Sequence, residues 1–216
     1  MSNVSLPPPA PRSAHPALRR IVALSGAASF LTLLVGSDLS PGGGSLEISA
    51  AAVGADFREN IDRFMWSASF LLASVALLLI FLGSLWQRLQ QGSAALAVVA
   101  VAGGAVTAAI WLLYAFLAIG AAVTGDAGDD QTARTIFLLE WASARVLAAP
   151  SLATVGAATV AGFVYAVFPA WFKFFSLVIV GLLLTALLPI GPAGLMGVLG
   201  ALWLAVASLV LAIRPR

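Results

Sequence analysis

Two ionisable residues at the start of a long apolar run, Glu140 and Arg145, are the side chains best suited to form a functional site. Ionisable groups close to a membrane interior are costly to bury, and they mark ligand sites, ion pathways or charge networks. Their separation of five residues places them about 140° apart on a helix, because each residue turns the helix by about 100°. They do not face each other as an i,i+4 pair would, so each is expected to find its partner on another element.

Candidate partners for both residues lie in the segment that precedes the second apolar run: Arg58, Asp62 and Arg63. The two arginines suit Glu140, and Arg145 is expected to contact either Asp62 or Trp141, which lies one turn above it. One interpretation is that these five residues form an interfacial charge network, which locks this segment against the helix that follows Glu140. The alternative is a ligand or ion site that opens outward, with Pro150 kinking the same helix.

The other residue types argue against an enzyme. The chain has no cysteine, and its single histidine, His15, lies in a proline-rich tail. Nucleophilic catalysis and zinc binding inside a membrane would need such residues on a span. Asp126, Asp129 and Asp130 lack the EF-hand pattern that ends in a glutamate, and Gly42 to Gly44 lack the ending of a phosphate-binding loop. We therefore expect no enzymatic activity, no cofactor and no bound metal.

The composition indicates which solvent surrounds the chain. Of its 216 residues, 61% are hydrophobic and 9% are charged, and the mean hydropathy is +1.04. A soluble domain has roughly 25% charged residues, so this chain lacks the polar surface that a soluble fold requires. Soluble globular proteins are excluded, and the lipid bilayer is the expected environment.

Six apolar runs are candidates for membrane spans, since roughly 20 helical residues cross about 30 Å of hydrocarbon. The runs show no alternation of apolar and polar residues, which excludes the strands of a membrane barrel. The expected fold class is therefore all-α, a polytopic bundle of six transmembrane helices. The expected spans are 21–36, 64–86, 94–123, 146–168, 171–188 and 193–213.

The charges sort to two sides when six spans are assumed. One side carries seven basic residues and no acid, and the other carries four arginines together with all nine acids. Because lysine and arginine near span ends stay in the cytoplasm, both termini are expected to be cytoplasmic (N-in, C-in). The seven basic residues are scattered, which favours anionic lipid headgroups over nucleic acid as their partner. They are Arg12, Arg19, Arg20, Arg88, Lys173, Arg214 and Arg216.

The sequence also predicts the structures of two segments outside the spans. Residues 1–17 contain five prolines and are expected to form a disordered cytoplasmic tail ahead of a transmembrane domain at 18–213. A secretory signal cleaved after Ser37 is the alternative for the first span. Residues 46–63 are expected to form a helix along the outer interface. Three apolar residues share one face of that helix and its continuation: Phe57, Ile61 and Phe64.

Small residues indicate where helices approach each other closely. Gly103, Gly104 and Ala108 form such a patch in the third run. That run is about 45 Å long as a helix, so it must tilt or protrude from the hydrocarbon. The residues that follow it, Gly125 to Asp130, are expected to form a short acidic outer loop.

Two motifs carry a resemblance to a known group of proteins. The first, FLGSLWQRL at residues 81–89, closes the second span, and the second, FPAWF at residues 168–172, joins the fourth span to the fifth. Over residues 18–213 the chain resembles uncharacterised bacterial six-helix integral membrane proteins with a domain of unknown function. The resemblance implies the six-helix architecture, and it implies no reaction or ligand. Lys173 departs from the group, in which a small or apolar residue is commoner at this place.

These observations predict a multipass protein of the bacterial cytoplasmic membrane. The leading hypothesis is a non-enzymatic structural or accessory component, which contacts the lipid bilayer and another membrane protein. The alternative is a small transporter or channel with an outward-facing charged vestibule around Glu140 and Arg145. A transporter predicts a polar cavity that reaches the middle of the membrane, whereas a packing protein predicts a closed bundle with its charges paired at the rim.

Overall fold

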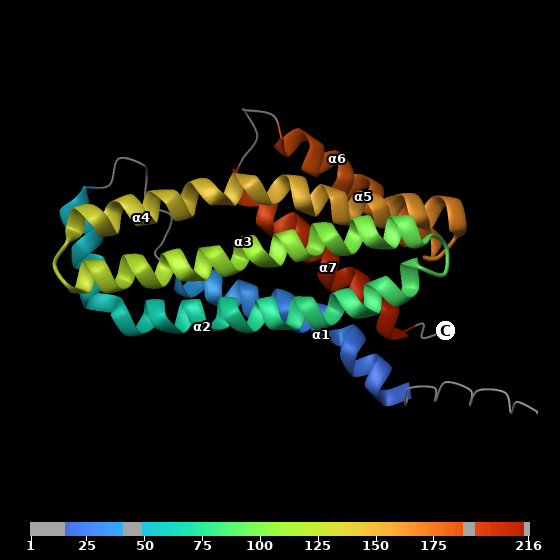
Figure 1. Ribbon diagram of the computed structural model, residues 1–216, viewed down its shortest axis with the longest axis horizontal. Coiled ribbons are helices and arrows are strands. Elements are labelled where there is room, and N and C mark those ends of the chain that lie inside the picture. Colours follow the sequence, from blue (N-terminus) through green and yellow to red (C-terminus); the bar gives the residue numbers. More distant parts are fainter. Residues whose placement is uncertain (1–15, 41–48, 188–192, 214–216) are drawn as a thin grey trace, which may run out of the picture.

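The computed structural model describes residues 16–40, 49–187 and 193–213, and every regular element in these ranges is helical (Figure 1). The all-α fold class is confirmed. His15, Gly42 to Gly44 and nearly all of the expected tail lie outside the described residues. The elements are α1 (Pro16–Leu39), α2 (Ala50–Leu89), α3 (Ala94–Asp126), α4 (Asp130–Ser143), the short 3-10 helix η1 (Ala144–Leu147), α5 (Ala148–Tyr165), α6 (Ala170–Ala186) and α7 (Ala193–Ile213).

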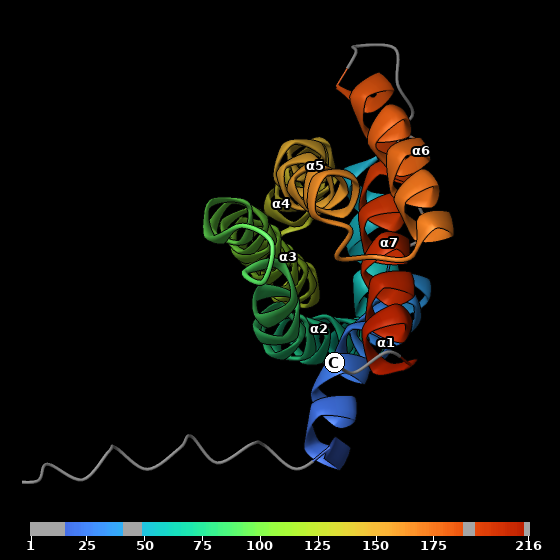
Figure 2. The ribbon, with the colours of Figure 1, turned by 90° about the vertical axis from the view of Figure 1, so that its right-hand side faces the viewer.

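The long helices run side by side along one axis of the molecule (Figure 1). α2 contacts α1 and α3, while α1 also contacts α7. α4, η1 and α5 follow one another along α3, so that this stretch of chain is one interrupted helical rod (Figure 1). α6 packs against α5 and α7, and the end view shows it at the edge of the bundle (Figure 2).

Four helices, α1, α2, α3 and α5, are long and apolar enough to cross a membrane by length and composition. The apolar stretches Ala170–Thr185 in α6 and Val198–Ile213 in α7 are shorter. These helices indicate a membrane protein, because only the bilayer provides a solvent for so many apolar surfaces. Six spans and the N-in, C-in orientation stay predictions.

Helix boundaries coincide with residues that bond to the free backbone amides of the first turn or that change the direction of the chain. The Ser49 hydroxyl accepts a hydrogen bond from the Ala52 amide at 3.2 Å at the start of α2, and Ser93 caps α3 in the same way. α5 ends at Ala166, which has a left-handed φ of 52°, and Pro169 precedes the first turn of α6. Such endings reverse the chain between antiparallel helices.

Buried apolar residues form two separate clusters. The larger lies between α1, α2, α3, α5, α6 and α7, and its fully buried side chains include Leu78, Phe81, Phe172 and Trp203. The smaller lies at one end of the molecule, where α2, α3 and α4 meet, and comprises Val53, Phe57, Phe64, Ala121, Ala122, Ala133 and Phe137. We call this end the cap, defined as residues 50–64, 121–126 and α4, and we call the rest of the helices the bundle.

α2 joins the cap to the bundle through a kink at Asn60. The backbone of Asn60 leaves the helical region, with φ −127° and ψ 24°. Its side-chain amide donates to the carbonyl oxygen of Asp56 at 3.2 Å and to the Asp56 carboxylate at 2.9 Å. The first turns of α2 therefore run across the ends of α3 and α4, and the rest of α2 runs along the bundle (Figure 1). The expected interfacial helix is thus continuous with the second span.

Candidate functional site

The five candidate residues occupy three different elements. Arg58, Asp62 and Arg63 lie on the exposed side of α2 around the kink, and Glu140 lies in the last turn of α4. Arg145 belongs to η1, and its side chain is outside the described part of the chain. Each of the other four has its own surroundings.

Arg58 holds the cap together from its outer edge. Its Nη1 donates to Oδ1 of Asp130 at 2.6 Å and to the carbonyl oxygen of Gly125 at 3.1 Å. The bond to Asp130 raises the pKa of the Arg58 guanidinium, so this residue stays charged. Gly54 permits the approach, because a Cβ at that position would lie 1.8 Å from Oδ1 of Asp130. The ion pair therefore ties α2 to the turn between α3 and α4.

The acidic loop expected between residues 125 and 130 is shorter than expected, because α4 already begins at Asp130. The Asp129 carboxylate accepts a hydrogen bond from the Thr132 amide at 3.1 Å, and bonds from Thr132 lower the pKa of Asp129. A negative charge at this place also suits the positive end of the helix dipole. Sequence reasoning did not predict that Asp129 caps α4 or that its charge suits the helix dipole. An Asp-Asp pair before an amphipathic stretch is nevertheless a signal for a helix start.

Arg63 connects α2 to the end of α1. Its Nη2 donates to the carbonyl oxygen of Asp38 at 2.9 Å, one residue before α1 ends. Carbonyl groups in the last turn of a helix have no partner within that helix, and a cation there also suits the dipole. Asp62, the neighbour of Arg63, is exposed. Both arginines in the cap part of α2, Arg58 and Arg63, are thus bonded at the rim of the molecule.

Glu140 differs from the other candidates because it is buried, with only 5% of its surface exposed. It continues the buried face of α4, since Ala133, Phe137 and Glu140 follow one another at spacings of four and three residues. It interacts electrostatically with Tyr114 on α3. Burial raises the pKa of the Glu140 carboxyl from 4.5 to about 7. Burial therefore disfavours the ionised form of Glu140.

Several hydroxyl groups in the bundle are bonded to the backbones of neighbouring helices, whereas others, such as those of Thr107 and Thr159, bond within their own helix. Ser29 on α1 and Ser74 on α2 bond each other reciprocally, because each hydroxyl donates to the other's carbonyl oxygen at 2.8 Å. Ser67 on α2 donates to the carbonyl oxygen of Gly36 on α1 at 2.7 Å. Such bonds join helices inside a membrane, where apolar contact alone gives little preference for another helix over lipid.

Ser208 of α7 enters the hydrogen-bond ladder of α1. Its hydroxyl accepts from the Ala27 amide at 3.0 Å and donates to the carbonyl oxygen of Ala23, the group that this amide would contact in an unbroken helix. A side chain inserted into the ladder bends a helix, and Figure 1 shows α1 changing direction between its first turns and the remainder. Gly26 lies at this crossing, where a Cβ would be 2.8 Å from the ring of Phe81.

The small-residue patch of α3 lies in close helix contacts, as expected. A Cβ at Gly103 would lie 2.7 Å from the carbonyl oxygen of Pro150 on α5, and one at Gly104 would lie 2.4 Å from Leu82 on α2. Thr154 on α5 donates to the carbonyl oxygen of Ala100 on α3 at 3.1 Å. At Gly103 the backbones of α3 and α5 are thus too close for a larger residue, and at Gly104 the space is filled by the side chain of Leu82.

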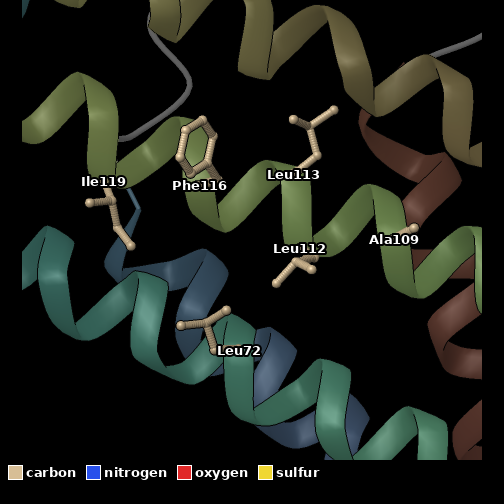
Figure 3. A pocket seen from close by; sticks show the side chains of 6 residues that line it. All are labelled: Leu72, Ala109, Leu112, Leu113, Phe116 and Ile119. Atoms are coloured by element: carbon tan, nitrogen blue, oxygen red, sulfur yellow. The ribbon is translucent and has the colours of Figure 1, made fainter.

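A surface groove of about 500 Å³ lies between α2 and α3 (Figure 3). Leu72 of α2 faces it across from α3, which supplies Ala109, Leu112, Leu113, Phe116 and Ile119. Every lining residue is apolar, and Phe116 is 69% exposed. This groove suits lipid chains or an apolar helix, and it offers no polar group to a solute.

The described residues contain no group of three or more His, Cys, Asp or Glu side chains that could hold a metal ion. No family model, curated protein or solved structure matches the chain. The resemblance to bacterial six-helix proteins therefore stays a prediction, and the geometry above carries the functional inference.

Proposed function

We propose that the chain is a non-enzymatic structural or accessory protein of the bacterial cytoplasmic membrane, with six spans and both termini in the cytoplasm. Its interior serves to pack helices, and its surface contacts lipid and another membrane protein. The apolar groove between α2 and α3 is the surface best shaped for such contact. Neither catalysis nor a cofactor is part of this proposal.

One observation carries the proposal: several buried hydroxyl groups in the bundle are bonded to the backbones of adjacent helices. Ser29, Ser67, Ser74 and Thr154 all donate to carbonyl oxygens on a neighbouring helix. A transport pathway would instead turn polar groups toward water or a solute near the middle of the membrane. Glycine contacts at the same crossings support the same conclusion, since they close the space between helices.

Cysteine labelling tests the closed interior directly, because the natural chain has no cysteine to interfere. Ser74→Cys and Thr154→Cys place thiols at buried positions in the bundle, and Glu59→Cys places one at an exposed position in the cap. A charged, membrane-impermeant thiol reagent is expected to label Glu59→Cys and to leave the other two unlabelled. Rapid labelling of both interior thiols would contradict the proposal and favour a water-filled pathway.

The same approach tests the orientation. Gln91 is exposed in the turn between α2 and α3, at the opposite end of α2 from Glu59. In sealed right-side-out vesicles, Glu59→Cys is expected to react with the impermeant reagent, and Gln91→Cys is expected to react only after the vesicles are opened. The reverse pattern would contradict the N-in, C-in orientation and leave the packing proposal intact.

Glu140 favours a second candidate function, a small transporter or channel with a vestibule around Glu140 and Arg145. A buried carboxyl next to the break between α4 and α5 resembles the discontinuous helices that hold substrates in transporters. Replacing Glu140 by glutamine would then abolish solute flux without lowering protein abundance. Unchanged flux with reduced abundance would instead support the structural role.

A further inference from the structure

The described charges are divided between the two ends of the molecule. The acids lie in the last turn of α1, the first turns of α2, the end of α3, the turn after it, and α4. At the opposite end, the start of α1, the end of α2 and the connection from α5 to α6 come together (Figure 1). The described residues of this end include no acid, and they carry four cations: Arg19, Arg20, Arg88 and Lys173. We call it the basic end.

Two of these cations contact other parts of the basic end. Nε of Arg88 donates to the carbonyl oxygen of Val167 at 2.8 Å, and Nζ of Lys173 lies 5.9 Å from the centroid of the Phe163 ring. Arg19 and Arg20 differ, because both are exposed and neither forms an ion pair within the described part of the chain. The first turns of α1 therefore carry two cations that are available to an anionic partner.

The same turns also expose an apolar face. Ala17, Ile21 and Leu24 follow one another at spacings of four and three residues, which places them on one side of α1. Leu18 and Ile21 are 54% and 66% exposed. Arg19 and Arg20 are turned by about 160° and about 100° from Ile21, since each residue rotates the helix by about 100°. Residues 17–24 are thus amphipathic, with arginines beside an exposed apolar face.

The direction and length of α1 place these turns at the surface of a bilayer. α1 bends where Ser208 enters its hydrogen-bond ladder between Ala23 and Ala27, and Figure 2 shows its first turns leaving the bundle. Its 24 residues are about 36 Å long, whereas the hydrocarbon is about 30 Å thick. The first turn therefore lies at the level of the headgroups when the rest of α1 crosses the hydrocarbon.

We propose that residues 17–24 of α1 form a binding site for anionic phospholipids. Arg19 and Arg20 bind the headgroup phosphates, for which the guanidinium group offers two parallel donors, and Leu18 and Ile21 insert among the upper parts of the acyl chains. Arg88 and Lys173 add to the attraction at the same end. A lipid matches both halves of this segment, whereas a nucleic acid or an acidic protein surface would leave Leu18 and Ile21 in water.

This inference rests on the proposed function, because it takes the bundle to lie in a bilayer, and it adds the class of lipid and the place where that lipid binds. The two fail separately. Loss of the lipid preference, with the interior thiols still unlabelled, would leave the packing role intact. Labelled interior thiols, with the lipid preference retained, would contradict the packing role and leave the lipid site intact.

Electron paramagnetic resonance on the complete chain in phosphatidylcholine vesicles tests the site, with a trace of spin-labelled phosphatidylglycerol or spin-labelled phosphatidylcholine as the probe. The natural chain should immobilise a larger fraction of the anionic probe, and about 1 M salt should abolish the difference. Arg19→Gln/Arg20→Gln should lose most of this preference, and Arg19→Lys/Arg20→Lys should retain it. The matched control, Arg58→Gln/Arg63→Gln, removes two charges from the cap and should also retain it.

The depth of the segment gives a second measurement that keeps both arginines. A spin label on Ala17→Cys lies on the apolar face, and the natural chain has no cysteine to interfere. In vesicles that contain phosphatidylglycerol, oxygen should relax this label more than a water-soluble nickel complex does. A label on the exposed Glu59→Cys in the cap should show the opposite order.

Three results would overturn the inference. Equal immobilisation of the two probes by the natural chain would show that no anionic lipid is selected. A preference that persists in Arg19→Gln/Arg20→Gln, or falls equally in the cap control, would assign it to other cations or to total charge. Nickel accessibility of the Ala17→Cys label equal to that of the Glu59→Cys label would place the first turns of α1 in water.

Discussion

The cap and the bundle are built from the same helices but are held together in different ways. In the cap, aromatic side chains fill a small apolar cluster, and charged side chains join α2 to its neighbours around it. The rings of Phe57 and Phe64 meet edge to face with their centroids 4.8 Å apart, and Arg58 forms an ion pair with Asp130. In the bundle, serine and threonine hydroxyls bond to backbones, and glycines allow helices to touch.

We attribute this difference to the solvent proposed for each region. Where water surrounds helices, removal of apolar surface from water drives association, and an exposed ion pair adds at most about 1 kcal/mol. Where lipid surrounds them, apolar side chains gain little by leaving the lipid, so close contact and interhelical hydrogen bonds select the partner. The arrangement of the two regions therefore matches a molecule whose cap lies in water and whose bundle lies in the bilayer.

The largest expected effect comes from removing the aromatic centre of the cap. Phe57 is 1% exposed and contacts Gly125, so Phe57→Ala should destabilise the cap by about 3–5 kcal/mol. Hydrogen exchange of the α4 amides should accelerate, while exchange in α5 should change little. Phe116→Ala, at a ring that is 69% exposed, is the control and should leave α4 unaffected. Equal acceleration in α4 and α5 would contradict the view that the cap is a separate unit.

A second large effect should appear as a pH dependence of stability. Burial raises the pKa of Glu140 to about 7 from an ordinary value of 4.5. Between these values the folded chain holds the proton and the unfolded chain has released it, so stability falls as the pH rises. The total loss across this window is about 3 kcal/mol, and stability from this group is constant above it.

Thermal unfolding in non-ionic detergent from pH 4.5 to 8 measures this slope. Glu140→Gln should remove it and make the variant more stable than the natural chain above pH 7, whereas Glu59→Gln should keep it. If the stabilities of the natural chain and of Glu140→Gln changed with pH in parallel, Glu140 would not contribute to the pH dependence.

An intermediate effect is expected where α3 approaches α5 in the bundle. Gly103→Ala puts a Cβ 2.7 Å from the backbone oxygen of Pro150, which cannot move aside as a flexible side chain would. The expected cost is about 1–3 kcal/mol, visible as a lower yield of monodisperse protein after extraction. Gly83→Ala is the matched control, because a Cβ there meets nothing within 4 Å. Equal yields of the two variants would argue against close packing in the bundle.

Much of this fold could be predicted from the sequence. Apolar runs bounded by serine, glycine or proline predicted the start of α3 at residue 94 and the extent of α7 at 193–213. The small-residue patch on α3 predicted where helices meet. The kink at Asn60 within α2 was not predicted, because it coincides with a local side-chain bond rather than with a proline or glycine.

The candidate site was harder to predict than the fold. Glu140 and Arg58 were identified by type, but the pairing of Arg58 with Asp130 depends on the reversal of the chain between α3 and α4, which no local pattern records. Burial of Glu140 could have been inferred, since Ala133 and Phe137 precede it at helical spacing. α4 was taken as loop and span entrance because its charges concealed the apolar face.

The smallest expected effects distinguish the two regions by their response to salt. Arg58→Gln removes an ion pair whose side chains are 40% and 28% exposed, so the loss of stability should be small and should vanish in about 1 M salt, where screening acts within about 3 Å. Ser74→Ala removes a buried hydroxyl bond between α1 and α2, with an expected cost of about 0.6 kcal/mol that salt does not change. Thermal unfolding of both variants at low and high salt measures the contrast. If the stability of Ser74→Ala responded to salt as strongly as that of Arg58→Gln, ions would have access to the bundle. The division into a cap in water and a bundle in the bilayer would then be wrong.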